Sequence, residues 1–285
     1  ANSEHPVFQK MAASSLVFHN AYTTVSHSSK ALYSIFCGVY PVIDMAINEA
    51  QTQTQEFCLP HWLAEKDFRS VFIQSADGDF EARDQLAKKV GFDAFIDGKD
   101  LAALGAKKLG YFSYDDGYLA TALEGQLQSN ASEKLFISLF SSNSHHPYNL
   151  VNEPCKSFPY RCYKNAAKQM DVHLGQILQV LQRYRAKEKT LLVLVGDHGE
   201  AFSEHGLNWH DTVPYEEVVN VPMLIQGPNI LPDDNYQLRS LIDLPVTVID
   251  ALTKSTISQW SMAKSLLSSR GHETIFSYCF YPKSC

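Results

Sequence analysis

Residues 191–210 read LLVLVGDHGEAFSEHGLNWH, a short apolar run that leads into a cluster of carboxylates and imidazoles. The apolar run, Leu191 to Val195, is too brief for a typical helix and ends at Gly196, which predicts a strand buried on both faces. Asp197 and His198 follow at once, where open α/β sheets bind their ligands. A carboxylate beside an imidazole suits a divalent metal with oxygen and nitrogen ligands. The stretch therefore predicts a metal or catalytic site, and the alternative is a polar surface loop with chance histidines.

Apolar runs of strand length alternate with helix-like stretches along the rest of the chain. Besides 191–195, strands are predicted for about 16–22, 68–75, 134–141, 221–228 and, at a sheet edge, 274–281. Helices are predicted before residue 16, for about 29–37, up to about Val90, and for 115–129, 160–186 and 238–252, while 91–97 reads as a connecting segment. This alternation predicts an α/β fold with a largely parallel central sheet sandwiched by helices. No linker or repeat interrupts residues 1–285, so we expect a single domain.

The composition is that of an ordinary globular protein, with 285 residues, 45% hydrophobic residues and a formal charge of -7. No basic stripe is present, which argues against a nucleic-acid partner. No apolar run approaches the roughly 18 residues of a membrane span. The chain opens on the polar sequence ANSEHP and not on a signal peptide, so we expect a removed targeting segment or a fragment.

Six cysteines bear on the compartment of the protein: Cys37, Cys58, Cys155, Cys162, Cys279 and Cys285. They form no CxxC pair, so a zinc-ribbon interpretation fails. Cys155 and Cys162 bracket a short loop, as do Cys279 and Cys285 near the end, and each pair is spaced to close a small disulfide. Two such pairs favour an oxidising compartment over six unrelated free thiols.

Ser28 lies at the start of the helix predicted for about 29–37, which Gly38 ends. The local sequence favours a plain N-cap, the commonest role of a serine in that place. The alternative is a nucleophile, because the positive end of a helix favours an alkoxide and the anion that it attacks. Two further strand ends carry polar groups toward the same expected crevice: His145 and His146 after the 134–141 strand, and Asp197 and His198 with His210.

Taken together, these motifs resemble the sulfatase-like branch of the alkaline phosphatase superfamily over nearly the whole chain. Residues 37–41 (CGVYP) match its T-G-x-Y-P stretch, and counting back from Gly38 places its nucleophile on Ser28 and not on Ser26. Residues 145–148 (HHPY) match its H-x-P-Y element. Residues 197–200 (DHGE) match its metal motif, and residues 203–206 (SEHG) match the following G-E-H-G.

The resemblance implies an alkaline phosphatase-like fold with a metal held by Asp197, His198 and Ser28, and with His145 and His210 as contacts of the substrate anion. It also implies a metal-binding carboxylate on a first strand upstream of residue 7, which this chain lacks. Hence we expect a truncated piece or an incomplete site. Lys30 is a candidate for added positive charge near the anion, against the alternative of a solvated surface lysine. His146, His205 and Glu204 are weaker candidates, with plain surface roles as the alternative.

Departures from the sulfatase pattern bear on the reaction. Lys30 and Leu32 replace the Pro or Ala and the Arg that accompany formylglycine formation, which favours an unmodified Ser28 hydroxyl. His210 stands where sulfatases tend to carry a lysine, and a histidine at this position is similar to the pattern of the phosphoethanolamine transferases. Residues 68–97 resemble the corresponding segment of the lipoteichoic acid synthase and phosphoglycerol transferase group. Phosphoryl chemistry with Mn or Zn is therefore favoured over a true sulfatase with Ca.

The substrate expected from the resemblance is a small-molecule, lipid or glycan ester, handled in the periplasm or outside the cell. A membrane-anchored parent protein fits the same resemblance. Hydrolase and transferase share one site and stay open. The alternative outside the enzymes is a non-catalytic binding module. A serine acyl hydrolase is disfavoured because no G-x-S-x-G elbow occurs.

Overall fold

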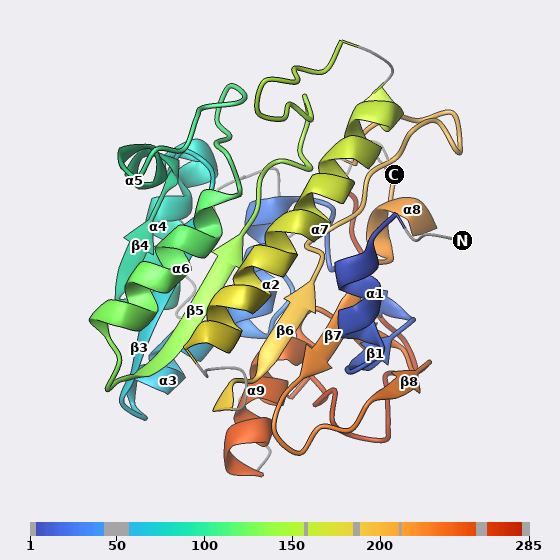
Figure 1. The fold of residues 1–285 in the computed structure, drawn as a ribbon. Helices are drawn as coiled ribbons and strands as arrows, with labels where there is room; N and C mark the ends of the chain where they lie inside the picture. The colour runs from blue at the N-terminus through green and yellow to red at the C-terminus, as the bar shows by residue number, and fades with distance from the viewer. Residues whose placement is uncertain are drawn as a thin grey trace. The chain divides into compact units, whose positions relative to one another are not determined.

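The computed structural model describes residues 4–42, 57–156, 159–184, 189–210, 213–254 and 261–280, with its elements labelled in Figure 1. The chain divides into two compact units, each built from two separate stretches. The first unit comprises Ala1–Ala13 and Leu63–Lys189, and the second comprises Ser14–Trp62 and Thr190–Cys285. The expectation of one catalytic domain over residues 1–285 stays a prediction.

A three-stranded parallel sheet in the order β4-β3-β5 forms the centre of the first unit (Figure 1). β3 spans Phe68–Gln74, β4 spans Ala94–Ile96 and β5 spans Lys134–Phe140. Val71 of the central strand pairs with Ala94 on one side and Ile137 on the other. Because the three strands run in one direction, their carboxyl ends lie together along one end of the sheet, which is here called its carboxyl edge. The segment that carries His145 begins at this edge.

Helices of the first unit pack on this sheet and on each other. α6 packs against β3 and α7, and α1 packs along α7. The backbone amides of Val7 and Phe8, in the first turn of α1, donate to the carboxylate of Asp171 in α7 at 3.0 and 2.7 Å. This satisfies donors that a helix start leaves unpaired. The elements are α1 Pro6–Ala12, the 3-10 turn η2 Phe80–Ala82, α4 Arg83–Val90, α5 Gly98–Ala103, α6 Tyr118–Ser129 and α7 Pro159–Arg183.

A mixed sheet in the order β6-β7-β1-β8 forms the centre of the second unit. β7 is antiparallel to both β6 and β1, whereas β1 and β8 are parallel. Its buried side chains include Phe18, Met223 and Ile225, which cluster with Ala31 and Leu244 from the helices. The bounds are β1 Leu16–Phe18, β6 Leu192–Val195, β7 Met223–Gln226 and β8 Asp233–Asn235.

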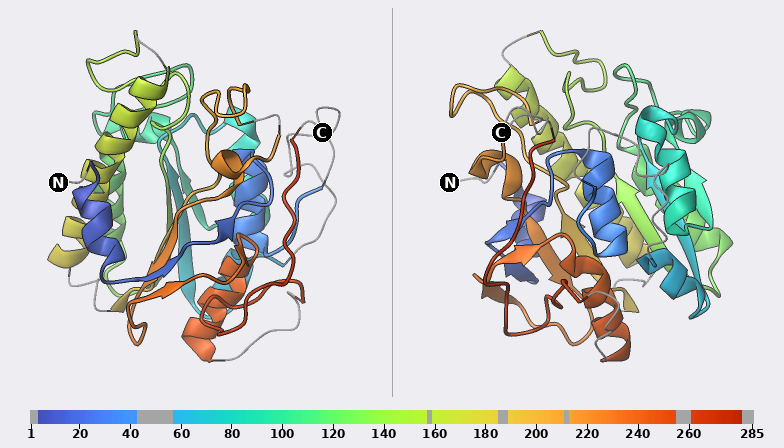
Figure 2. Two further views of the ribbon diagram at one scale, coloured as in Figure 1. Left: turned by 90° about the vertical axis from the view of Figure 1, so that its right-hand side faces the viewer. Right: turned by 180° about the vertical axis from the view of Figure 1, so that it is seen from behind.

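The helix that carries Ser28 packs against α9 within the second unit (Figure 2). It ends as predicted at Gly38, whose left-handed φ of 66° suits a residue without a side chain. None of the helices in the described ranges is long and apolar enough to cross a membrane. The remaining bounds are α2 Ser28–Cys37, α3 Leu59–Ala64, which runs from the second unit into the first, α8 Glu216–Val219, α9 Asp243–Thr253, β2 Ala21–Tyr22 and β9 Arg239–Ser240.

The α/β class predicted from the alternating strands and helices is confirmed, with a wholly parallel sheet in the first unit and a mixed one in the second. Two predicted strands differ in detail. The run at 16–22 divides into β1 and β2, because the two halves pair with different strands. β6 is only partly buried, since it lies at the edge of its sheet and pairs with β7 alone among the described strands.

Three further segments differ from the prediction. The connecting segment expected at 91–97 contains β4, because three of its residues pair with β3. The helix expected from 238 begins at Asp243, because Arg239 and Ser240 pair with β2 first. In place of a strand at 274–281, the described part of this stretch makes only an isolated bridge from Tyr278 to Val25.

Disulfides tie together cysteines both near and far in sequence. The predicted bond between Cys155 and Cys162 is confirmed. Cys279 is also disulfide-bonded, but its predicted partner Cys285 lies outside the described residues. A bond between Cys37 and Cys58, 21 residues apart, was not predicted, because nothing in the local sequence links the end of α2 to the start of α3.

Candidate active site

Ser28 is the first residue of α2, and its side chain faces the histidine of the D-H-G-E motif. The N-cap of α2 is His27, which has extended backbone angles. Ser28 Oγ lies 3.2 Å from His198 Nε2, and the residue is buried, with 8% of its surface exposed. The N-cap role that the local sequence favours is therefore wrong, because the helix starts one residue earlier than expected. The hydroxyl takes part in a polar cluster instead.

Asp197 and His198 follow the end of β6, as the sequence predicts. Asp197 Oδ2 lies 3.5 Å from His198 Nε2. His198 Nδ1 lies 2.8 Å from the carbonyl oxygen of Gly199, so Nδ1 carries the proton of the neutral ring. Burial lowers the pKa of His198, although the neighbouring Asp197 opposes this effect. The lone pair of Nε2 is thus directed toward Ser28.

His210 joins this cluster through the ring of His198. The two imidazoles stack with centroids 4.2 Å apart. His210 Nδ1 lies 3.0 Å from a carboxylate oxygen of Glu200, whose side chain is 6% exposed. The pair orients His210 so that its Nε2 is directed away from Glu200. Glu200 was not among the predicted site residues, and its place in D-H-G-E was the only signal for it.

A hairpin-like loop returns the chain from Glu200 to His210. Phe202 bridges Asn208, and the amide of Trp209 donates to the Ala201 carbonyl at 3.1 Å. Trp209 holds a left-handed φ of 75°, a conformation that costs a bulky residue free energy. The loop thus fixes the backbone that presents His210.

The weaker candidates of the same loop make contacts that account for them structurally. His205 Nδ1 lies 2.8 Å from a carboxylate oxygen of Glu217, and the His205 ring stacks on Tyr215. The carboxylate of Glu204 accepts from the amide of Phe202. Neither residue has a contact with Ser28 or His198 among the described interactions.

Lys30 is buried, with 2% of its surface exposed, and its ammonium donates to the Val42 carbonyl at 3.0 Å. The alternative of a solvated surface lysine is therefore wrong. Lys30 follows Ser28 by two residues, in the first turn of α2. Its role toward an anion stays a prediction.

His145 belongs to the first unit, in the segment after β5. Its ring meets that of Phe112 edge-on at 4.9 Å, and its Nδ1 lies 2.8 Å from the His146 carbonyl. His146 meets the ring of Tyr148 edge-on. The role of His145 as an anion contact stays a prediction from the H-x-P-Y match.

A buried carboxylate holds the start of this segment. Asp116 is 1% exposed and accepts from the Ser75 hydroxyl and from the amides of Ser142 and Asn143, the latter two at 3.0 and 3.2 Å. Burial raises the pKa of the Asp116 carboxyl. Asp116 thereby ties together the carboxyl ends of β3 and β5. This role was not predicted, because the pattern at 115–129 indicates a helix; α6 begins only at Tyr118, and Asp116 precedes it.

The glycine of D-H-G-E is required by a close approach of backbone. A Cβ on Gly199 would lie 2.1 Å from the Glu217 carbonyl oxygen, and the Gly199 amide donates to the Val218 carbonyl at 2.7 Å.

We expect Gly199→Ala to lower the free energy of unfolding by about 1–3 kcal/mol, because rigid backbone must move to make room. Denaturant unfolding measures the effect. Gly125→Ala is the matched control: nothing lies within 4 Å of that site in α6, so it should be neutral or stabilising. An unfolding midpoint for Gly199→Ala at or above that of the wild type would contradict the close-approach argument.

The donor set of the cluster fits part of a metal site. Among the described residues, no group of three His, Cys, Asp or Glu side chains is arranged to hold a metal ion. With the Ser28 hydroxyl counted, however, Oγ of Ser28 and Oδ2 of Asp197 both lie within 3.5 Å of the unprotonated Nε2 of His198. Oxygen and imidazole donors of this kind suit Zn or Mn.

Known proteins match both the sequence and the fold. The family model described as Sulfatase matches residues 2–254. Choline-sulfatase of Rhizobium meliloti (strain 1021) is 28% identical over 109 residues, which are 38% of this chain and 21% of that protein. Phosphoglycerol transferase I of Xanthomonas campestris pv. campestris (strain B100) is 23% identical over 151 residues, which are 50% of this chain and 22% of that protein. The matched stretches thus span about a fifth of these curated relatives.

Solved structures share the architecture at low sequence identity. A protein of the alkaline phosphatase superfamily from Vibrio parahaemolyticus matches with a TM-score of 0.80 at 20% identity, covering 96% of this chain and 67% of that one. A lipoteichoic acid synthase from Listeria monocytogenes matches with a TM-score of 0.72 at 21% identity, covering 90% and 68%. These matches confirm the predicted fold. Since the family model covers nearly the whole chain, the protein belongs to the sulfatase family.

Proposed function

We propose that this protein transfers a phosphoryl group from an ester to Ser28, and then to water or to an acceptor hydroxyl. The observation that carries the proposal is the Ser28 hydroxyl, placed at the start of α2 and 3.2 Å from Nε2 of the buried His198. Nucleophilic serines are activated by an adjacent base or by metal coordination, and here the proposed activator is a divalent cation that His198 would help to hold. Substrates of the phosphoglycerol or phosphoethanolamine type are favoured, and the alternative is hydrolysis of sulfuric esters.

In this proposal, the side chains of the second unit have separate roles. The Ser28 hydroxyl loses its proton to solvent and Oγ forms a bond to phosphorus while the bond from phosphorus to the alcohol oxygen breaks, and the departing alcohol takes up a proton. His210, oriented by Glu200, donates a hydrogen bond to an oxygen of the transferring group or supplies that proton. The positive end of α2 favours the anion beside Ser28. Water or an acceptor hydroxyl then attacks the phosphorus, the bond from phosphorus to Ser28 Oγ breaks, and the proton lost by the attacking oxygen balances the one that Ser28 regains.

A divalent cation held by Asp197, His198 and Ser28 would supply positive charge that favours the ionised hydroxyl and offsets charge on the ester oxygens. The single protonated nitrogen of His198 supports this assignment, because its hydrogen bond to Gly199 leaves Nε2 as a ligand. Mn or Zn is proposed for phosphoryl transfer, and Ca if the protein is a true sulfatase.

Two features support phosphoryl over sulfuryl chemistry. Lys30 and Leu32 depart from the pattern that accompanies formylglycine, so Ser28 is proposed to act unmodified. His210 stands where sulfatases carry a lysine, and its contact with Glu200 gives it an orienting partner. Among the relatives, one is named a choline-sulfatase and one a phosphoglycerol transferase, so both chemistries belong in the test.

A direct assay tests the proposal. The purified chain is stripped of metal with a chelator, then given Mn, Zn or Ca, and supplied with matched aryl phosphate, phosphodiester and sulfate esters. We expect metal-dependent turnover of a phosphate ester or diester. Turnover of the sulfate ester alone would favour the sulfatase alternative and formylglycine at Ser28. No turnover with any metal would favour a non-catalytic binding module.

The compartment and the larger context are also proposals. The disulfides Cys37–Cys58 and Cys155–Cys162 support an oxidising compartment, which fits a periplasmic or extracellular location. A lipid or glycan ester is the substrate class proposed from the resemblance. The membrane-anchored parent protein and the upstream carboxylate of the family stay predictions.

A further inference from the structure

The segment from His272 to Phe280 runs beside the residues that lead into Ser28. The amide of Tyr278 donates to the Thr24 carbonyl at 2.8 Å, and the Ser277 hydroxyl donates to the Thr23 carbonyl at 2.6 Å. Tyr278 also forms a parallel bridge with Val25. Both views of Figure 2 show this part of the chain, in red, passing alongside α2.

The last described residue of the segment packs on the N-cap of α2. The ring of Phe280 stacks on the imidazole of His27, with centroids 4.1 Å apart and an angle of 17° between the planes. Both side chains are buried, with 5% and 7% of their surfaces exposed. The stack with Phe280 thus holds one face of the His27 ring at the start of α2. Ser28 is the next residue along the chain.

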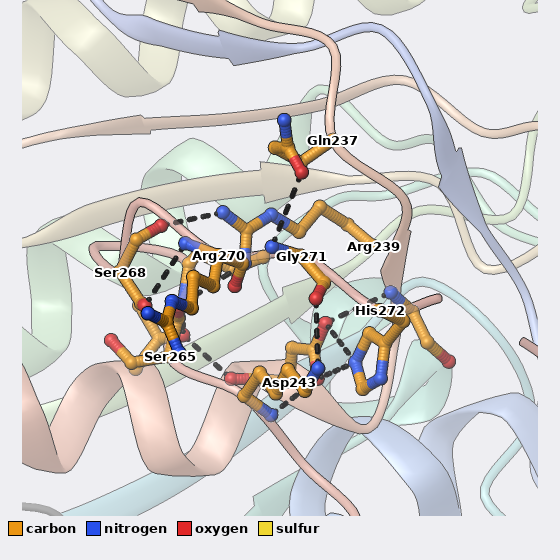
Figure 3. Close-up of polar contacts among 12 residues, drawn as sticks. Gln237, Arg239, Asp243, Ser265, Ser268, Arg270, Gly271 and His272 are labelled. Carbon is orange, nitrogen blue, oxygen red and sulfur yellow. Dashed lines mark hydrogen bonds and ion pairs between the residues drawn. The ribbon is translucent and has the colours of Figure 1, made fainter. Parts of the chain in front are cut away.

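The other end of the segment is anchored by hydrogen bonds between a histidine and a buried carboxylate (Figure 3). His272 Nε2 lies 2.8 and 3.0 Å from the two carboxylate oxygens of Asp243, the first residue of α9. The His272 amide donates to the Leu238 carbonyl at 3.0 Å. The carboxylate of Asp243 also accepts from the amides of Ser240 and Lys264. Because α9 packs against α2, the segment is fixed to the same body that carries Ser28.

We infer that Phe280 is a positioning residue for the nucleophile, acting through its stack on His27. Adjacent Cα atoms are held about 3.8 Å apart by the peptide bond, so a backbone shift of His27 into the space left by the Phe280 ring would also move Ser28. The contact between Ser28 Oγ and His198 Nε2 spans only 3.2 Å, and a misplacement of about 1 Å from a distant change can cost about a hundredfold in rate. The inference rests on the proposed role of Ser28.

Kinetics of Phe280→Ala test the inference. We expect kcat to fall about 10- to 100-fold while KM changes less than about twofold, because the reacting atoms are misaligned and substrate binding is untouched. Phe280→Tyr keeps the ring and should restore most of kcat. Phe276→Ala is the matched control, since Phe276 lies in the same segment, is 51% exposed and meets only Tyr40 edge-on among the described aromatic contacts. Equal losses in Phe280→Ala and Phe276→Ala would overturn the inference, as would a rise in KM alone.

A crystal structure of Phe280→Ala decides the inference even if the wild type turns over no ester. We expect the separation of Ser28 Oγ and His198 Nε2 to exceed hydrogen-bond distance. A separation that stays at 3.2 Å would overturn the inference, whereas absence of turnover with a displaced Ser28 would count against the proposed function only. If Phe280→Ala does not fold, Phe280→Leu, which removes the ring but fills more of its space than alanine, replaces it in both measurements.

Discussion

Replacing Ser28 by alanine should lower kcat by at least about a thousandfold, because removal of a nucleophile leaves only binding and electrostatic stabilisation. The hydroxyl is buried against His198 at 3.2 Å and faces no other side chain among the described hydrogen bonds. Affinity for Mn or Zn, measured by titration of the metal-free chain, should fall only modestly, since Asp197 and His198 remain. Steady-state turnover of the best ester found is the measurement.

Ser26→Ala is the matched control for this experiment. Ser26 is also buried, at 1% exposure, and lies two residues before Ser28. Counting back from Gly38 assigns the nucleophile to Ser28, so Ser26→Ala should keep kcat within about threefold, as expected for a residue outside the chemistry. Near-normal turnover of Ser28→Ala, or a loss confined to Ser26→Ala, would show that the nucleophile is assigned to the wrong serine.

Asp116→Ala should be among the most destabilising single substitutions in the first unit. It leaves the amides of Ser142 and Asn143 buried without their acceptor, and leaves the Ser75 hydroxyl with only the Ser142 hydroxyl, at 2.9 Å, as a side-chain partner. Each buried donor left unpaired costs about 1–3 kcal/mol, so we expect a loss of about 3–5 kcal/mol in the free energy of unfolding. Thermal and denaturant unfolding measure it.

The adjacent Asp115 provides the control. Asp115 is only partly buried and accepts from one amide, that of Gly117, at 3.0 Å. Asp115→Ala should therefore cost about 1 kcal/mol. A cost for Asp116→Ala no larger than for Asp115→Ala would mean that water or relaxation satisfies the three donors, and that Asp116 does not hold the ends of β3 and β5 together.

The parts of this protein that were predictable from sequence are those encoded locally. A five-residue apolar run before Asp197 and His198 predicted β6 and the cluster after it, and Gly38 predicted the end of α2. The disulfide between Cys155 and Cys162 closes a loop short enough to be recognised from spacing alone. In each case the deciding residues lie within one element or one turn.

The parts that were missed depend on contacts between distant residues. The pairing of His210 with Glu200 requires the loop between them to fold back, and no periodicity encodes such a return. Asp116 was expected in the helix predicted for 115–129, and only the folded sheet shows that it joins the ends of β3 and β5. The N-cap prediction for Ser28 failed because α2 begins one residue earlier than expected, and the partner of its hydroxyl, His198, could not be found locally because it lies 170 residues away.

The bond between Cys37 and Cys58 has a consequence for how the protein is produced. It closes a loop of 21 residues at the last residue of the helix whose first residue is Ser28. Cross-linking a loop of this length removes conformational freedom from the unfolded chain worth about 3 kcal/mol. Material made in a reducing cytoplasm would lack this covalent fastening. The protein should therefore be secreted into an oxidising compartment of the host, and its free thiols should be counted. Every rate discussed above should be measured on that material.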